Sequence, residues 1–196
     1  MKKYLIRTLS ILFIAIFLTS CGMQSIPTAA NQVEADWAEV QNQYKRRSDL
    51  IPNLVAVVKG YATHEQETLT KVIEARAKAT AVTFTADQLT EANMKKFQQA
   101  QAGVSSALSR LMVSVEKYPD LKANENFRDL QSQLEGTENR ITVARNRYIE
   151  AIKEFNNLVT VPPTSWYNSL ALHLTKKPQF EVENLQEAQK APTVKF

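Results

Sequence analysis

Apolar residues recur in a strict 4-3 alternation along residues 33–82, and this period constrains the fold more than any other feature of the chain. It is the spacing of the a and d positions of packed α-helices, sustained far beyond chance alternation. All but three of the positions are apolar or aromatic. The positions are Val33, Trp37, Val40, Tyr44, Arg47, Ile51, Leu54, Val58, Tyr61, Glu65, Thr68, Val72, Ala75, Ala79 and Val82. The period predicts one long helix over residues 33–82.

Pro52 lies in the middle of this stretch. A proline inside a helix costs about 3 kcal/mol, because it lacks an N–H and its ring meets the preceding turn. Asp49 could instead cap a new helix that has Pro52 in its first turn. Since the period passes Pro52 without a slip, we favour a continuous, kinked helix and keep a restart after Asp49 as the alternative.

Two further helices follow. Residues 83–86 interrupt the pattern, with Thr85 and Gln88 at capping-box spacing, and Asn124 is a good N-cap for the third helix. The second seam comprises Phe97, Gln101, Val104, Leu108, Leu111, Val115 and Tyr118. The third comprises Phe127, Leu130, Leu134, Thr137, Ile141, Ala144, Tyr148, Ala151, Phe155 and Leu158. With a short helix near residues 166–174 and no strand period, the sequence predicts an all-α antiparallel bundle of three long helices plus a short C-terminal helical segment.

The N-terminus resembles a lipoprotein signal. A basic start precedes an apolar run over residues 9–18, about half the ~20 residues that a membrane-spanning helix needs. Residues 18–21 (LTSC) resemble a lipobox, in which the cysteine thiol receives a diacylglyceryl group and cleavage occurs before it. We expect lipidation at Cys21, with palmitate-type acyl chains anchoring the protein. The alternative is a secreted protein with a free thiol; as the only cysteine, Cys21 forms no intrachain disulfide.

Four segments follow from these patterns: a cleaved signal peptide (1–20), a tether containing Pro27 (21–30), a helical bundle domain (31–180) and a flexible tail (181–196). The chain has 24 basic and 20 acidic residues, and removal of Lys2, Lys3 and Arg7 leaves 24 − 3 = 21 basic residues. A nearly neutral mature chain lacks the positive field that nucleic-acid binding needs, so that class is excluded.

No catalytic constellation is recognisable. His64 and Glu65 begin an HExxH-like run, but the second histidine is missing and His173 lies far along the chain. The chain has no GxSxG motif and no Gly-rich phosphate loop. We therefore expect neither an enzyme nor a bound metal or cofactor.

Four polar residues lie on or beside the seams. Arg47 and Glu65 take core-facing positions in the first helix, and Arg145 and Arg147 flank the seam of the third. Buried charges need partners, so the favoured interpretation is a set of polar layers that fix the register. A polar site for a ligand or partner peptide is the alternative. The basic run 45–47 is interpreted as a solvated face rather than a lipid-headgroup patch.

Helix lengths predict an overhang. At 1.5 Å per residue, a first helix over residues 33–82 is about 75 Å long, and a second over residues 86–117 is about 48 Å long. About eighteen residues of the first helix would then lack a neighbour. This stripe contains Trp37, Val40 and Tyr44. We expect it to be a surface for partner docking or self-association just above the lipid.

Two long blocks resemble the LemA family. Residues 44–79 (YKRRSDLIPNLVAVVKGYATHEQETLTKVIEARAKA) are similar to its signature block, and residues 116–157 to its second block. The resemblance covers residues 37–180 and implies an all-helical, membrane-associated bacterial protein. Many members begin with a transmembrane helix, which a lipobox replaces here. The resemblance supplies no catalytic residues.

These observations favour a membrane-anchored, non-enzymatic scaffold that binds other cell-envelope proteins and could form homo-oligomers. The alternatives are a ligand- or peptide-binding bundle, which would need a cavity of at least a few hundred Å³, and an accessory subunit of an envelope protease or transport complex. Gly22 follows Cys21 where aspartate often retains lipoproteins in the inner membrane. In a host with two membranes, we therefore favour the periplasmic face of the outer membrane.

Replacement of Cys21 tests the anchor. Cys21→Ser removes the thiol that would accept the diacylglyceryl group, so the variant should accumulate as an unacylated, poorly processed precursor. Metabolic labelling with a clickable fatty acid should mark the wild type and leave the variant unlabelled. Equal labelling of both would exclude lipidation at Cys21.

Overall fold

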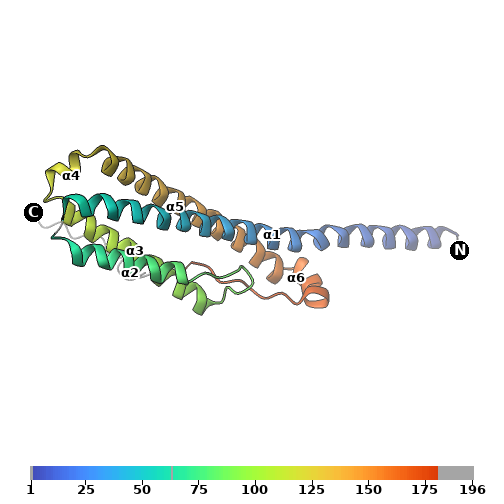
Figure 1. The fold of residues 1–196 in the computed structure, drawn as a ribbon. Helices are drawn as coiled ribbons and strands as arrows, with labels where there is room; N and C mark the ends of the chain where they lie inside the picture. Colours follow the sequence, from blue (N-terminus) through green and yellow to red (C-terminus); the bar gives the residue numbers. More distant parts are fainter. Residues whose placement is uncertain (1, 63, 181–196) are drawn as a thin grey trace, which may run out of the picture.

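The computed structural model describes the backbone of residues 2–62 and 64–180, and the side chains from residue 24 onward within those ranges. Over these residues the regular structure is helical, without strands, which confirms the all-α prediction (Figure 1). The helices are α1 (Lys2–Tyr61), α2 (Gln66–Ala81), α3 (Glu91–Val115), α4 (Pro119–Ala123), α5 (Glu125–Thr160), α6 (Thr164–Tyr167) and the π-helical turn η1 (Asn168–Leu172).

The bundle is an elongated set of antiparallel helices. α1 and α5 pack side by side along most of its length, while α2 turns back beside α1 and pairs with α3 (Figure 1). α4 caps the end where α3 leads into α5. α6 and η1 form a corner at the opposite end, beside the place where α1 leaves the bundle towards the N-terminus (Figure 1). The short C-terminal helical segment is thus confirmed.

The prediction of one unbroken helix over residues 33–82 is wrong. α1 ends at Tyr61, a turn closed by Glu65 N–H on the Ala62 carbonyl follows at 3.1 Å, and α2 begins at Gln66. Gly60, a weak helix former, marks the end. Tyr61 is 46% exposed, whereas Ala62 is buried. The apolar period continues through the turn because both legs of a helical hairpin face the same core, so the bundle has four principal helices rather than three.

Pro52 does lie inside α1, which confirms the continuous path through it. Its missing N–H would leave the Ser48 carbonyl, four residues earlier, without a helical donor. Arg76 Nε of α2 donates to that carbonyl at 2.8 Å. The defect in one helix is therefore repaired by a side chain of its neighbour, and the same bond ties α2 to α1.

Residues 24–30, which were predicted to belong to a tether, are instead part of α1. Residues 24–30 are helical, with Ile26 fully buried and Ala29 nearly so. Pro27 stays exposed within α1 while its neighbour Ile26 continues the apolar seam seven residues before Val33. The packed body therefore begins at Ile26 rather than at residue 31. The side chains of residues 1–20 and Cys21, and the whole tail 181–196, lie outside the described residues.

α5 follows its predicted seam closely. Asn124 caps it by accepting the Phe127 N–H at 3.0 Å, and the seam residues from Phe127 to Phe155 are buried. Only the last position shifts, from Leu158 to Val159. α3 begins at Glu91 rather than near residue 86, because Thr90 caps it by accepting the Asn93 N–H at 3.2 Å.

The Arg76 bond predicts a coupling between two distant positions. Arg76→Ala should lower the free energy of unfolding by about 1–3 kcal/mol, because it leaves the Ser48 carbonyl unpaired. In a Pro52→Ala background the same change should cost less, since the introduced alanine supplies a backbone N–H to that carbonyl. Denaturant melts of both single variants and the double variant give the coupling energy. Strict additivity would show that the bond does not compensate for the proline.

Candidate functional site

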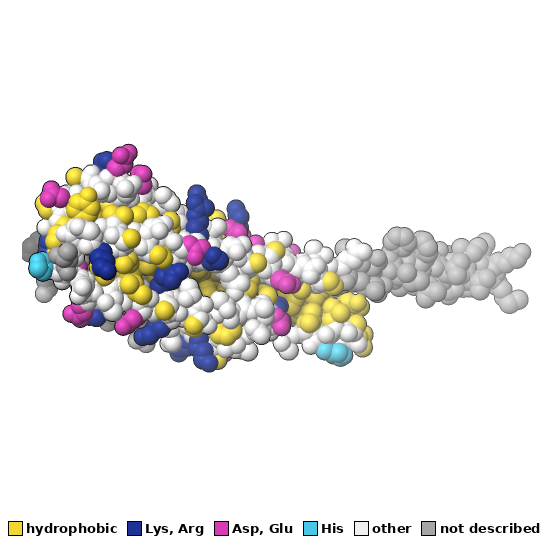
Figure 2. Space-filling model, viewed as in Figure 1, with side chains coloured by type: hydrophobic (Ala, Val, Ile, Leu, Met, Phe, Trp, Pro, Cys, Tyr) yellow, Lys and Arg dark blue, Asp and Glu magenta, His cyan; other side chains and the backbone are white. Residues whose placement is uncertain are grey.

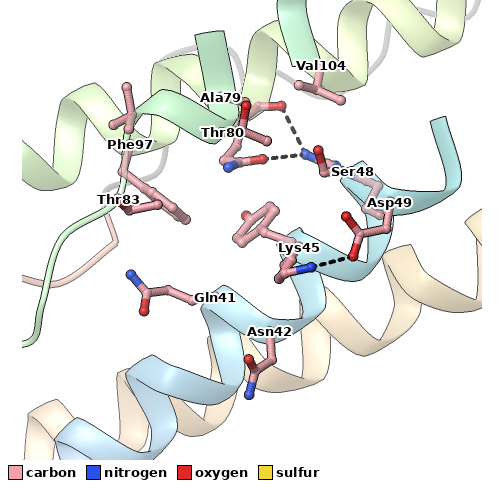
Figure 3. Close-up of a pocket in the computed structure, with 14 residues that line it drawn as sticks. Gln41, Asn42, Lys45, Ser48, Asp49, Ala79, Thr80, Thr83, Phe97 and Val104 are labelled. Atoms are coloured by element: carbon pink, nitrogen blue, oxygen red, sulfur yellow. Dashed lines mark hydrogen bonds and ion pairs between the residues drawn. The ribbon is translucent and has the colours of Figure 1, made fainter. Parts of the chain in front are cut away.

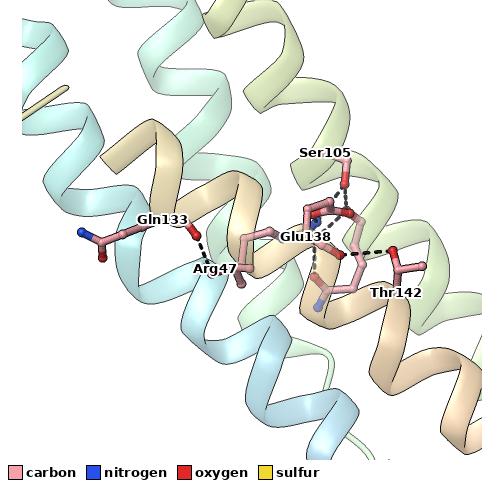
Figure 4. Close-up of polar contacts among 7 residues, drawn as sticks. Arg47, Ser105, Gln133, Glu138 and Thr142 are labelled. Carbon is pink, nitrogen blue, oxygen red and sulfur yellow. Dashed lines mark hydrogen bonds and ion pairs between the residues drawn. The ribbon is translucent and has the colours of Figure 1, made fainter. Parts of the chain in front are cut away.

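Arg47 forms a polar layer in the middle of the bundle (Figure 4). The residue is only 2% exposed. Its Nη1 donates to Ser105 Oγ and Glu138 Oε2, both at 2.9 Å. Its Nη2 donates to Gln101 Oε1 at 2.9 Å and to the Gln101 carbonyl at 3.2 Å. A guanidinium buried on α1 thus joins three helices at once, since its partners come from α3 and α5.

This layer separates two apolar clusters. The cluster on the N-terminal side of Arg47 in α1 includes Trp37, Phe97 and Tyr148, and the other includes Ile51, Leu111 and Leu134. Sliding α1 by one turn would bring the charge of Arg47 into one of the clusters, where it would lose its partners. The geometry is that expected of the register-fixing interpretation.

The other three polar candidates do not join Arg47 in one site. Glu65 is half-buried at the start of α2, where it accepts from Tyr118 Oη at 3.3 Å. Arg145 is half-buried, and its guanidinium lies 4.6 Å from the ring centre of Phe180. Arg147 is exposed. Glu65 thus makes a local contact of its own, whereas Arg145 is connected to Arg47 only through Tyr44.

Tyr44 links Arg47 to Arg145. Burial raises the pKa of the Tyr44 hydroxyl above its usual value, and the positive charges of Arg145 and Arg47 oppose part of that rise. The Arg47 guanidinium also lies 5.0 Å from the Tyr44 ring centre. Burial likewise raises the pKa of Tyr148, whose hydroxyl has no hydrogen-bond partner among the described residues. Both phenols stay protonated at neutral pH and contribute packing rather than charge.

The predicted partner surface on Trp37 is wrong. Trp37 is 1% exposed, and its Nε1 donates to the Phe84 carbonyl at 2.7 Å. Its ring centre lies 5.1 Å from that of Phe97, 5.2 Å from Tyr148 and 6.2 Å from Phe180. The indole is held in a cage made by the same chain.

Val40 and Tyr44 are buried as well, at 0% and 8% exposure. Because α1 ends at Tyr61 instead of residue 82, the α2–α3 connection reaches further along the first helix than predicted. Buried Phe180, which follows the last helical segment, packs in the same core cluster as Trp37, Val40 and Tyr44. No overhang with these three residues exists.

A cleft of about 400 Å³ opens beside the Arg47 layer, between α1, the end of α2 and α3 (Figure 3). Phe97 and Val104 are apolar parts of its lining, and Gln41 and Thr80 are polar parts. Ser48 is buried there, and its hydroxyl has no hydrogen-bond partner among the described residues. The volume is within the range of small-molecule sites, which meets the size criterion for a ligand- or peptide-binding bundle.

Chemistry-bearing side chains are dispersed. Across residues 24–62 and 64–180, no three His, Cys, Asp or Glu side chains gather as a metal site would require. His64 is exposed at the α1–α2 turn. The cleft has one ion pair at its edge, Lys45 to Asp49 at 2.6 Å within α1. The arrangement suits binding, and it brings no nucleophile and base together.

Sequence reasoning missed Arg76 and Phe180. Arg76 could have been found, because a helix-interior proline demands an outside donor for the carbonyl four residues earlier. Phe180 had a weaker signal, being the first aromatic residue in the polar stretch that follows the last helical segment. Its burial over Tyr148, 5.4 Å between ring centres, depends on tertiary packing alone.

Replacing Arg47 should lower the free energy of unfolding much more than replacing its ion-pair partner Glu138. Arg47→Met leaves the Gln101 and Ser105 oxygens without their donor, so the free energy of unfolding should fall by about 2 kcal/mol or more. Glu138→Gln should change it by less than about 1 kcal/mol, because the Glu138 side chain is 56% exposed and easily rehydrated. Denaturant melts measure both. A neutral or stabilising Arg47→Met would show that apolar packing serves the layer equally well.

In the described part of the chain, none of the helices is both long and apolar enough to cross a bilayer.

Known proteins resemble the chain over most of its length. The magnetosome proteins MamQ 2 and MamQ 1 of Paramagnetospirillum magneticum are each 23% identical over 181 residues, covering 82% of this chain and 66% of theirs. Protein LemA of Metamycoplasma hominis is 26% identical over 152 residues, covering 74% of this chain and 64% of its own. The chain thus spans slightly less than two thirds of the length of these relatives. The model of the LemA family matches residues 36–196, and the chain belongs to the LemA family.

Proposed function

We propose that this protein is a membrane-anchored, non-enzymatic helical scaffold that binds other proteins of the cell envelope. The observation that carries the proposal is the continuity of α1, which runs without a joint through residue 21 and into the core of the bundle. Residues 24–61 of that helix extend about 57 Å at 1.5 Å per residue. An acyl anchor at Cys21 would therefore hold a rigid arm rather than a tethered domain.

Family membership supports the membrane setting, since the LemA resemblance implies membrane association. The anchor would be the acylated Cys21, because residues 18–21 resemble a lipobox. In a host with two membranes, Gly22 after the cysteine favours the periplasmic face of the outer membrane.

Binding is favoured over catalysis by the way the polar groups are used. Arg47, the most buried charged side chain among the described residues, makes four hydrogen bonds that hold helices together. α2 and α3 meanwhile expose Ile73 and Val113, at 50% and 71%. These exposed apolar side chains, rather than Trp37, are the surfaces on the bundle that an envelope protein would contact.

A second function is favoured by the cleft beside Arg47. Its volume of about 400 Å³ and the unpaired Ser48 hydroxyl suit a small polar ligand or a peptide segment. In that case the bundle would be a carrier or an accessory subunit that presents a bound segment, and contacts would concentrate at residues such as Thr80.

Site-specific photo-crosslinking in cells separates these functions. A photoreactive amino acid at Ile73 or Val113 should yield adducts with other envelope proteins, whereas the same residue at exposed Gln133 on α5 serves as the control. Adducts confined to Thr80 would favour the cleft-binding function instead. Equal adducts at all four positions, or none, would contradict the scaffold proposal.

A further inference from the structure

The corner at the N-terminal end of the bundle exposes an apolar surface. We define the corner surface as Val161, Trp166, Leu170 and Leu174, which are 53%, 65%, 83% and 40% exposed. Figure 2 shows hydrophobic side chains gathered at this end, beside the place where α1 leaves the bundle. Leucine and tryptophan are rarely left this exposed without a reason when they occur together.

The corner surface is held in place by the residues facing inward. Asn168 is buried, and its Nδ2 donates to the Val159 carbonyl at 3.2 Å and to the Leu174 carbonyl at 2.9 Å. Its Oδ1 accepts the Leu174 N–H at 2.9 Å. Tyr167 and Leu172 pack against the core cluster that contains Trp37. The outward position of Trp166 and Leu170 therefore belongs to a fixed structure.

This surface lies close to the predicted anchor. α6 packs against α1, and the core cluster under the corner includes Ile26, near the start of the described α1 side chains. Ile26 is five residues from Cys21, which is about 7.5 Å along a helix. The corner therefore lies within a short distance of the point at which acyl chains would enter a bilayer.

The distribution of charged residues around the corner also favours contact with a membrane. No acidic residue occurs between Glu154 and Glu181, and no charged residue of any kind occurs in α1 between Arg7 and Glu34. Within residues 155–180 the only charged side chains are Lys176 and Lys177, and the preceding Glu154 lies beside Ser25 and Thr28 of α1. The segment that carries the corner surface therefore has no carboxylate, so it can approach lipid headgroups without repulsion or a large desolvation penalty, and exposed Lys176 favours anionic headgroups.

We propose that the corner surface rests on the bilayer that holds the anchor, with Trp166 at the level of the lipid headgroups. This deepens the proposed function and rests on it, because the acyl chains at Cys21 must first bring the corner to the membrane. Tryptophan prefers that interface, and buried apolar area adds to the affinity of acyl chains. Because α1 is uninterrupted, this second contact would fix the orientation of the bundle relative to the membrane.

Fluorescence quenching by brominated lipids tests the contact. The acylated full-length protein, purified from bacterial membranes, would be reconstituted into phosphatidylethanolamine–phosphatidylglycerol vesicles with and without dibrominated acyl chains. The chain has two tryptophans, and Trp37 is enclosed by protein, so the emission lost in Trp166→Phe isolates Trp166. Roughly half or more of the Trp166 emission should be quenched, because an interfacial indole lies beside the upper acyl chains.

The matched control moves the exposed tryptophan to the far end of the bundle. In the Trp166→Phe background, Val113→Trp introduces an indole at a position that is 71% exposed on α3, and it should show no quenching. Flotation of the vesicles is measured on the same samples. Protein that fails to float would overturn the membrane anchor and the corner contact together.

Protein that floats with unquenched Trp166 would leave the anchor intact and overturn the corner contact. A Trp166 emission that is blue-shifted but unquenched would overturn it in favour of a protein cover, such as a second copy or residues 181–196. Equal quenching of both tryptophan positions would also overturn it, because the bundle would then lie flat on the lipid.

Discussion

The carbonyl of Ser48 has no donor within α1, because the residue four positions on is Pro52, and Arg76 of α2 supplies the missing N–H at 2.8 Å. The long first helix depends on this bond, since a proline interior to a helix otherwise leaves a buried acceptor unpaired. The bond also fixes where α2 lies against α1. Once α2 is placed there, α3 pairs with it, and the side of the bundle opposite α5 is determined.

The Arg76–Ser48 bond positions α2 against α1, and the Arg47 layer sets the register of α1 against α3 and α5. Its partners belong to α3 and α5, so three helices have to arrive in one alignment for the guanidinium to be satisfied. Apolar clusters lie on both sides of the layer and would tolerate several alignments by themselves. Glu138 remains more than half exposed, which keeps the desolvation penalty of the ion pair small. The layer is thus better suited to selecting an alignment than to adding stability.

Periodicity predicted which faces are buried, and it could not predict where the chain reverses. α5 follows its seam because one helix packs on a continuous core, and Asn124 marks its start chemically. The turn after Tyr61 left the 4-3 period almost intact, so a helical hairpin and a single long helix predict nearly the same pattern of apolar residues. The burial of Trp37 followed from that turn and from Phe180, whose contact is non-local. The core position of Arg47 was predictable from its seam position, whereas its partners and the cleft depend on how α2 and α3 are placed.

Because α1 is uninterrupted, an anchor at Cys21 would restrict the orientation of the bundle as well as its location. A flexible tether would let the bundle take any orientation, and any exposed side chain could then meet a partner in the membrane or beyond it. With Ile26 buried in the core, the bundle begins within about two helical turns of Cys21. Surfaces on α2 and α3 that lie towards the α1–α2 turn are then held tens of Å from the lipid, since residues 24–61 alone span about 57 Å. The apolar corner and the exposed residues Ile73 and Val113 thereby face different environments, and one chain can present a membrane-proximal end and a separate protein-binding end.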